Sequence, residues 1–341
     1  MSTCNIHISF IVPVYNDVNG ISECLTAINT WVSDSTEIIV VDDASTDDSP
    51  SVAQKFKVRL LRLPKNSGPA AARNCGARNA NGNILFFVDS DVVVASDAIK
   101  RVTECFEDQP DVAAVFGSYD SNPRGTSIVS RYRNLLHHFV HQNGNSEAAT
   151  FWAGCGAIRR DVFEAVGGFD SRRYPKASIE DIELGYRLRQ KGHRIFLDKK
   201  LQGTHLKRWT LWSLVKTDIY NRAIPWARLI LERKNSPNDL NLKGAQRLSG
   251  SLVLLAGLLV AAGFLRVEFL LLAAAAILSV GILNRNLYAF FRRQHGLLFS
   301  AVGLLLHLLY FLYSGLSYVY AWGEFQLKSV VASKSKPIPT E

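Results

Sequence analysis

The first 90 residues alternate short, continuously apolar runs with segments whose apolar residues recur at helical spacing. The runs predict buried strands and the spaced segments predict helices. The predicted strands are 8–14, 37–41, 58–63 and 84–88, and the predicted helices are 20–31 and 69–79. Because a continuously apolar strand is covered on both faces, this alternation predicts a doubly wound, mostly parallel α/β sheet with functional loops at the strand carboxyl ends.

Beyond residue 96 the pattern is less regular. The predicted elements are a helix at 97–108, strands at 112–117 and 151–158, a helix at 179–191 and a short strand at 194–197. The stretch 121–144 is polar, with several His and Arg residues, and is interpreted as a mobile segment.

From about Leu248 the chain becomes largely apolar. The apolar segments are 248–265, 268–283 and 297–322. As helices they would be about 23–39 Å long, near bilayer thickness for all but the shortest. They predict a transmembrane region at 248–323 with two or three helices, followed by a polar tail at 324–341. Core helices of a soluble protein are the alternative.

The segment 206–234 interleaves Trp and Tyr with Lys and Arg. Such a composition is typical of the headgroup layer of a bilayer, so we predict an interfacial amphipathic segment at the end of a catalytic domain spanning 1–235. An ordinary amphipathic helix that packs on this domain is the alternative.

The formal charge of +9 fits nucleic acid, an anionic membrane surface or an anionic substrate. The basic residues gather just before and between the apolar segments, which favours a membrane surface. Zinc-finger spacing, an RNP-like motif and a long basic run are all missing, so we expect no nucleic-acid partner.

The positive-inside rule places the catalytic domain and the basic loop 284–295 on the cytosolic side of a multi-pass cell (inner or plasma) membrane protein. A third span would put the tail, with Lys328, Lys334 and Lys336, outside, mildly against that rule.

The five cysteines are odd in number and form no CxxC pair, which predicts a reducing compartment. The residues before the first strand lack a signal-peptide pattern, so we expect the main domain to stay in the cytosol.

The sharpest chemical feature follows the fourth predicted strand, where Asp89 and Asp91 stand two residues apart. Both carboxylates can approach one divalent cation, Mg²⁺ or Mn²⁺, which takes oxygen ligands and bridges phosphates. Such a cation neutralises the charge that develops on a sugar diphosphate leaving group. An Asp-x-Asp triplet also occurs in turns and caps, but its place after a parallel strand favours a metal site.

Two further acidic pairs stand at predicted element ends. Asp42 and Asp43 end the second strand, where a carboxylate can accept from a base N–H or a ribose hydroxyl; helix capping is the alternative. Glu180 and Asp181 open a helix, where a carboxylate can act as general base on an acceptor hydroxyl. A capping-box-like helix start is the alternative for this second pair.

These motifs follow one another in a fixed order: IVPVYN at 11–16, VVDDASTDDS at 40–49, NSGPAAARN at 66–74, FVDSD at 87–91, GCGA at 154–157, GGFD at 167–170 and ED at 180–181. The ordered set resembles the family-2 inverting glycosyltransferases with the GT-A fold, over roughly residues 6–205. The resemblance implies a metal-dependent, hexosyltransferase-like enzyme of cell-envelope glycan synthesis that uses a nucleotide-sugar donor. A UDP-sugar is favoured by analogy with the family.

The resemblance also implies roles for single residues. The positions that match the family's nucleotide-sugar contacts are Pro13, Tyr15, Asp42, Asp43, Arg73 and Asp89. Asp91 matches the metal ligand, with Asp89 beside it. Asp181 matches the catalytic base, supported by Glu180, and Gly154, Cys155 and Gly156 would form the acceptor loop. His205 stands where some relatives place a metal or diphosphate contact; a structural histidine is the alternative.

One departure from the family concerns the Gln-x-x-Arg-Trp motif of its processive synthases. Here Lys207-Arg208-Trp209 is present, but the Gln is missing from its expected place. This absence predicts a non-processive enzyme, and the Glu180-Asp181 motif with the 154–156 loop favours a hydroxyl acceptor on a lipid or a lipid-linked glycan. The alternatives are a polyisoprenyl-phosphate glycosyltransferase and a non-catalytic membrane scaffold that retains the fold.

Overall fold

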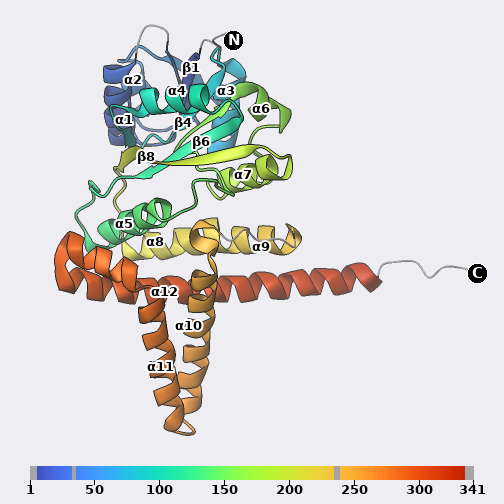
Figure 1. Cartoon of the computed structure of the whole chain (residues 1–341). Helices are drawn as coiled ribbons and strands as arrows, with labels where there is room; N and C mark the ends of the chain where they lie inside the picture. Colours follow the sequence, from blue (N-terminus) through green and yellow to red (C-terminus); the bar gives the residue numbers. More distant parts are fainter. Residues whose placement is uncertain (1–5, 33–35, 234–238, 335–341) are drawn as a thin grey trace, which may run out of the picture. The chain divides into compact units, whose positions relative to one another are not determined.

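The computed structural model describes residues 6–32, 36–233 and 239–334, with side chains up to residue 329. Figure 1 shows the arrangement of its helices and strands. The chain divides into two compact units, Met1–Trp209 and Thr210–Glu341. The second unit begins at Thr210, within the segment 206–234 that the sequence predicts as interfacial.

The first unit is built on one eight-stranded sheet in the order β3-β2-β1-β4-β7-β6-β8-β5. The strands are β1 (Ile8–Val14), β2 (Glu37–Asp42), β3 (Arg59–Arg62), β4 (Ile84–Val88), β5 (Val92–Val94), β6 (Val112–Tyr119), β7 (Cys155–Arg159) and β8 (Arg194–His205). β1 to β4 are parallel, whereas β7 and β5 run antiparallel to their neighbours. The sheet is therefore mixed, although most of its strands share one direction.

Helices cover both faces of this sheet. They are α1 (Val18–Trp31), α2 (Ser49–Ala53), α3 (Pro69–Asn79), α4 (Ala98–Asp108), α5 (Ile128–Gln142), α6 (Arg160–Ala165) and α7 (Glu180–Gln190). On one face, Phe10 and Phe86 stack and share a core with α1 and α4. On the other face α3 lies so close that a Cβ on Gly76 would be 2.5 Å from Ile11. The continuous burial of β1 and β4 follows from this double cover.

The stretch 121–144 contains an ordered helix, α5, instead of the mobile segment expected from its polar composition. Tyr132, Leu135 and Leu136 occur at helical spacing within it and are buried. The His and Arg residues between them hid this periodicity. The predicted strand at 194–197 also extends much further, to His205, because β8 pairs with both β6 and β5.

The second unit is helical. It contains α8 (Leu211–Thr217), the π-helix η1 (Asp218–Ala223), α9 (Ile224–Arg233), the 3₁₀ turn η2 (Leu240–Leu242), α10 (Gly244–Gly263), α11 (Glu268–Leu283) and α12 (Arg285–Lys334). α10 and α11 form an antiparallel hairpin (Figure 1). α12 is broken at His295 and Gly296, where the backbone leaves helical geometry.

Two helices of this unit are long and apolar enough to cross a membrane. They are Gly244–Gly263, with mean hydropathy 1.6, and Arg285–Ser329, with mean hydropathy 1.9. α11 is apolar but shorter. The three predicted apolar segments thus appear as three helices.

Candidate active site

The loops after β1 and β2 lie against each other at the carboxyl ends of these parallel strands. Ser45 accepts a hydrogen bond from the Asn16 backbone N–H at 3.0 Å, and the Asn16 side chain accepts from the Thr46 N–H at 2.8 Å. Asn16 and Ala44 both have positive φ, at 51° and 60°. Left-handed backbone at non-glycine residues is typical of functional sites, where the surrounding contacts enforce it.

Asp43 is held rigidly at this edge. Its two carboxylate oxygens accept from the N–H groups of Ser67 and Gly68, at 2.7 and 2.8 Å, just before α3 begins. Burial raises the pKa of Asp43 above its usual value, partly offset by these two hydrogen bonds. The neighbouring Asp42 is ion-paired with Arg62 at 3.0 Å and accepts a hydrogen bond from the Ser45 N–H. It therefore supports the loop that follows β2. Of the other predicted donor residues, Pro13 is buried and Tyr15 is 46% exposed.

Arg73 joins two carboxylates that are distant in sequence. Its Nη1 bonds Glu180 at 2.9 Å and its Nη2 bonds Asp89 at 2.5 Å. Arg73 and Glu180 are both buried, and although burial opposes the charge, Asp89 and Glu180 raise the pKa of Arg73. Its Nε is buried without a hydrogen-bond partner in the described part of the chain. Arg73 thus links α3, the end of β4 and the start of α7.

Replacing Arg73 by Met is expected to lower the free energy of unfolding by about 3–5 kcal/mol, because it leaves the Glu180 charge buried and uncompensated. Urea denaturation of the purified protein measures this loss. Arg78→Met on the exposed side of the same helix is the control, and its effect is expected to stay within about 0.5 kcal/mol. Equal losses for the two variants would contradict the pairing.

Asp181 lies in the first turn of α7, beside this network. Its carboxylate accepts from the N–H groups of Ala153 at 3.2 Å and Ile182 at 2.8 Å. Burial, followed by the charge of Glu180, raises the pKa of Asp181 to about 7, against the lowering effect of Arg73. A carboxylate with such a pKa is suited to take a proton near neutral pH.

Asp91 is paired with His205, whose Nε2 lies 3.5 Å from the Asp91 carboxylate. Burial pushes the pKa of Asp91 up, but His205 and the charge of Lys207 outweigh it, so the pKa lies below its usual value. Asp89, two residues earlier, pairs with Arg73 instead. The described residues contain no group of three or more His, Cys, Asp or Glu side chains that could hold a metal ion.

An ionised carboxylate next to an imidazole nevertheless fits a Mg²⁺ or Mn²⁺ ion, which takes few protein ligands and completes its shell with phosphate and water.

The predicted acceptor loop lies between these groups. Asp89 donates its N–H to the Gly154 carbonyl at 3.2 Å, one residue after Ala153 contacts Asp181. A Cβ on Gly156 would be 2.3 Å from the Trp152 carbonyl, so the loop closes tightly on itself. Cys155 is a buried thiol whose pKa is raised, chiefly by burial.

The structure adds residues that the sequence analysis missed. Asp17 caps α1 and accepts a 2.8 Å hydrogen bond from Ser90 within the Asp-Ser-Asp loop. Tyr119 stacks on His205 with ring centroids 4.2 Å apart, and the Trp152 ring makes an edge contact with Tyr119 at 4.8 Å. Asp17 follows a strand end as Asp43 and Asp91 do, and that position was the signal that could have identified it.

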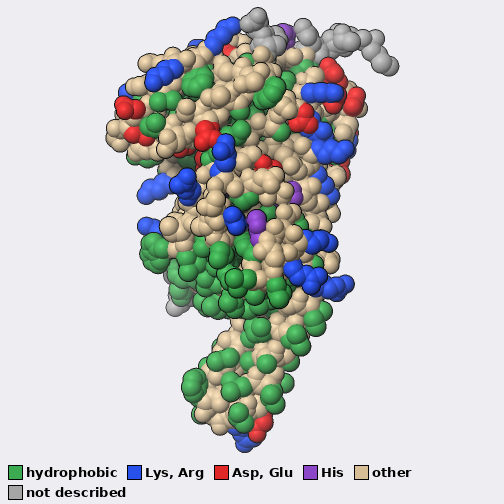
Figure 2. Space-filling model, turned by 90° about the vertical axis from the view of Figure 1, so that its left-hand side faces the viewer, with side chains coloured by type: hydrophobic (Ala, Val, Ile, Leu, Met, Phe, Trp, Pro, Cys, Tyr) green, Lys and Arg blue, Asp and Glu red, His purple; other side chains and the backbone are tan. Residues whose placement is uncertain are grey.

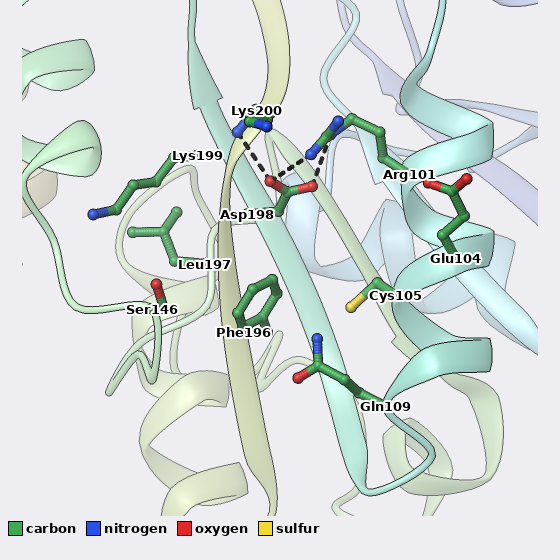
Figure 3. A pocket seen from close by; sticks show the side chains of 10 residues that line it. All are labelled: Arg101, Glu104, Cys105, Gln109, Ser146, Phe196, Leu197, Asp198, Lys199 and Lys200. Carbon is green, nitrogen blue, oxygen red and sulfur yellow. Dashed lines mark hydrogen bonds and ion pairs between the residues drawn. The ribbon is translucent and has the colours of Figure 1, made fainter.

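A hollow of about 350 Å³ lies between α4 and β8 (Figure 3). Its lining includes Arg101 and Asp198, which form an ion pair at 2.8 Å, and Cys105, whose pKa burial raises to about 12. None of its lining residues belongs to the predicted site. The pairing of Arg101 with Asp198 and the raised pKa of the Cys105 thiol give this hollow no feature that connects it to the predicted chemistry.

Taken together, α3, the end of β4 and the start of α7 bring Arg73, Asp89 and Glu180 into one hydrogen-bonded group, and Asp181 follows Glu180 in the first turn of α7. Asp91 connects to Asp181 through a series of contacts: His205 pairs with Asp91 and stacks on Tyr119, the Tyr119 ring packs on Trp152, and the N–H of the next residue, Ala153, donates to Asp181. Asp43 joins through the turn that starts α3. The arrangement can hold an anion, a cation and a proton-accepting carboxylate in one place.

Residues 9–167 match the model of the family described as glycosyl transferase family 2. A pre-mycofactocin glycosyltransferase from Mycobacterium tuberculosis is 30% identical over 199 residues, which are 55% of this chain and 40% of that protein. Glycosyltransferase GlyA from Streptococcus pneumoniae is 40% identical over 119 residues, which are 33% of this chain and 17% of that protein. The matched part thus spans less than half the length of either relative.

Among solved structures, mannosyltransferase PcManGT from Pyrobaculum calidifontis, in complex with GDP-Man and Mn²⁺, superimposes with a TM-score of 0.58. The match covers 93% of this chain and 88% of that one at 19% identity, so the likeness shows the fold alone.

Proposed function

We propose that this chain, whose residues 9–167 match the glycosyl transferase family 2 model, is a membrane-anchored, inverting, non-processive glycosyltransferase. It moves a sugar from a nucleoside-diphosphate sugar to a hydroxyl of a lipid or lipid-linked glycan at the cytosolic membrane face. The observation that carries this proposal is the placement of Asp181. Its carboxylate has a pKa of about 7 and lies beside the Arg73–Asp89 pair and the 153–156 loop.

The donor lies along the loops after β1, β2 and β4 in this proposal. Asp43 and Tyr15 hold the base and ribose, with Pro13 and Asp42 shaping that pocket. The buried Nε of Arg73 is a donor left for an anionic ligand, while its other nitrogens fix Asp89. The family analogy favours a UDP-sugar, whereas the Pyrobaculum structure contains GDP-Man, so both donors belong in any screen.

Asp91 and His205 would hold a divalent cation, with Asp89 next to them. The Mn²⁺ in the Pyrobaculum structure supports this assignment. When bound, the cation offsets the negative charge of the nucleoside diphosphate that leaves. Tyr119 fixes the ring of His205 by stacking, and the charge on Lys207 helps to keep Asp91 ionised.

Asp181 takes the proton of the acceptor hydroxyl as that oxygen attacks the anomeric carbon from the face opposite the diphosphate. The bond to the sugar forms on one face while the bond to the leaving oxygen breaks on the other, which inverts the configuration. Glu180, bound to Arg73, keeps α7 in place and supports Asp181. Gly154 and Gly156 leave space for Trp152, and the acceptor loop reaches Asp89 through the Gly154 carbonyl and Asp181 through the Ala153 N–H.

A donor screen tests the proposal. Purified full-length protein in detergent with Mn²⁺ or Mg²⁺ is offered UDP- and GDP-sugars together with membrane lipid extract, and released nucleoside diphosphate is measured. Transfer to a lipid hydroxyl gives a glycolipid that resists mild acid. A monophosphate lipid product that mild acid releases would indicate a polyisoprenyl-phosphate acceptor, and no turnover with any donor would refute the proposal.

The pH dependence of transfer is expected to follow Asp181. Below a pH of about 7 its carboxyl is protonated and cannot accept a proton, so kcat/KM should fall about tenfold per pH unit. Above that pH the base is ionised and the rate should level off. Measuring kcat/KM from pH 5 to 9 checks this sign, and a rate that rises toward acid pH would contradict the assignment.

A further inference from the structure

The part of α12 that follows the break at Gly296 carries one continuous apolar face. Leu298, Leu305, Leu312 and Leu316 are spaced by seven, seven and four residues, which places them on one side of a helix. Their exposed fractions are 76%, 63%, 38% and 55%. We call these four residues the apolar stripe. It covers about 27 Å at 1.5 Å per residue.

A different side of α12 makes polar contacts with the preceding helices of the same unit. The Tyr313 hydroxyl donates to Asp218 at 2.6 Å, and Asp218 also pairs with Arg222 at 2.9 Å. Further along, Glu324 pairs with Arg228 at 2.9 Å. Figure 1 shows α9 running alongside α12. η1 and α9 are therefore fixed to α12 along much of its length.

These contacts make α12 unsuitable as a membrane span, despite its length and hydropathy. If it crossed the hydrocarbon layer, η1 and α9 would be carried in with Asp218, Arg222 and Arg228. Charged side chains in the hydrocarbon layer are costly and rare. Lying flat avoids this cost, because the charged helices then remain on the watery side.

The α10–α11 hairpin supports the same orientation. It runs across the direction of α12 in Figure 1, and it meets α12 near the middle, where Val253 and Val280 pack on Phe311. Figure 2 shows apolar side chains along the hairpin and charged side chains gathered at its tip. Only the hairpin can stand along the membrane normal if α12 lies in the membrane plane.

We propose that α12 lies in the surface of an anionic bilayer with its apolar stripe in the lipid. The α10–α11 hairpin is then the sole crossing within the described residues. The exposed Arg292, Arg293 and Lys328 on α12 complement the negative headgroups. The polar tail then stays on the side of the catalytic domain, as the positive-inside rule prefers. This inference rests on the proposed membrane anchoring and is independent of the sugar chemistry.

Depth measurements on the full-length protein test it. The protein is reconstituted in vesicles of phosphatidylcholine and phosphatidylglycerol, in a background whose cysteines are replaced by alanine. Single spin labels are placed at Leu298→Cys, Leu305→Cys, Leu312→Cys and Leu316→Cys. Relative accessibility to oxygen and to a polar nickel reagent gives the depth of each label.

The four labels are expected to sit at one shallow depth. Matched labels at Leu248→Cys, Leu255→Cys and Leu258→Cys on α10, which are also exposed, are expected to differ in depth because that helix crosses the bilayer. A steep depth gradient along the stripe, deepest near Leu312, would overturn the inference. So would labels that all remain in water.

A second readout separates the inference from the proposed function. A fluorescent protein fused to the C-terminus should fold and be fluorescent in cells, whereas alkaline phosphatase in the same place should be inactive. An active phosphatase fusion would overturn the in-plane placement even if transfer is normal. Conversely, a protein with shallow stripe labels but no transfer with any donor would refute the proposed function and leave the placement of α12 standing.

Discussion

Asp181→Asn is expected to lower kcat for sugar transfer by about 10²–10⁴-fold, because the amide cannot accept the acceptor proton. Donor binding should change little, since Asp181 contacts the 153–156 loop and not the loops assigned to the nucleotide. Steady-state kinetics with the donor identified in the screen measure kcat, and calorimetry measures donor affinity. The pH dependence near 7 should also disappear in this variant.

The control is Asp161→Asn. Asp161 occupies the first turn of α6 and accepts from the next N–H at 2.8 Å, as Asp181 does in α7, but it is exposed. A helix-capping role alone would give both substitutions the same small effect. If Asp181→Asn retained full transfer, the assigned base would be wrong.

Asp91→Asn is expected to reduce transfer by about 10³-fold, which corresponds to about 4 kcal/mol of lost charge stabilisation. The physical reason is that an uncharged amide next to His205 binds a divalent cation far more weakly than the carboxylate does. Nucleoside diphosphate affinity should rise with added Mn²⁺ in the natural protein and respond little in the variant. Calorimetric titration with and without Mn²⁺ measures this response.

Asp108→Asn, at the exposed end of α4, serves as the matched control and should leave the Mn²⁺ response unchanged. Unfolding curves of both variants show whether the fold is intact. A Mn²⁺ response that survives in a folded Asp91→Asn protein would remove Asp91 from the cation site.

Much of the fold could be predicted because local signals agreed with the packing. Helix α3 begins at Pro69 and ends at Asn79 as expected, since Pro suits a first helical turn and Gly68 breaks the chain before it. The prediction of a mostly parallel sheet agrees with most of the strands, but not with β7 and β5, which are antiparallel. Their direction depends on long connections whose path no local pattern records. Helix α5 was missed because of a local signal that was obscured. Its buried Tyr132 and Leu135 follow a helical period, but charged neighbours hid this period.

For the site, the sequence indicated which residue types carry charge but not which of them pair. Asp42 and Asp43 look equivalent in the sequence, yet one is ion-paired with Arg62 and the other holds the turn before α3. Asp89 and Asp91 likewise diverge, one to Arg73 and one to His205. Such pairing depends on side chains more than 15 positions away, so it becomes visible only in the folded chain.

Gly68 has a consequence for attempts to alter substrate choice. Its φ is +84°, and a Cβ there would lie 2.5 Å from the Pro175 carbonyl oxygen, on the segment that leads to Asp181. The backbone at Gly68 thus packs directly on the backbone of residues 175–176, with no space for a side chain. In the proposed site, redesign of nucleotide preference therefore has to start from exposed positions such as Tyr15, because enlarging residue 68 would displace the segment that leads to Asp181.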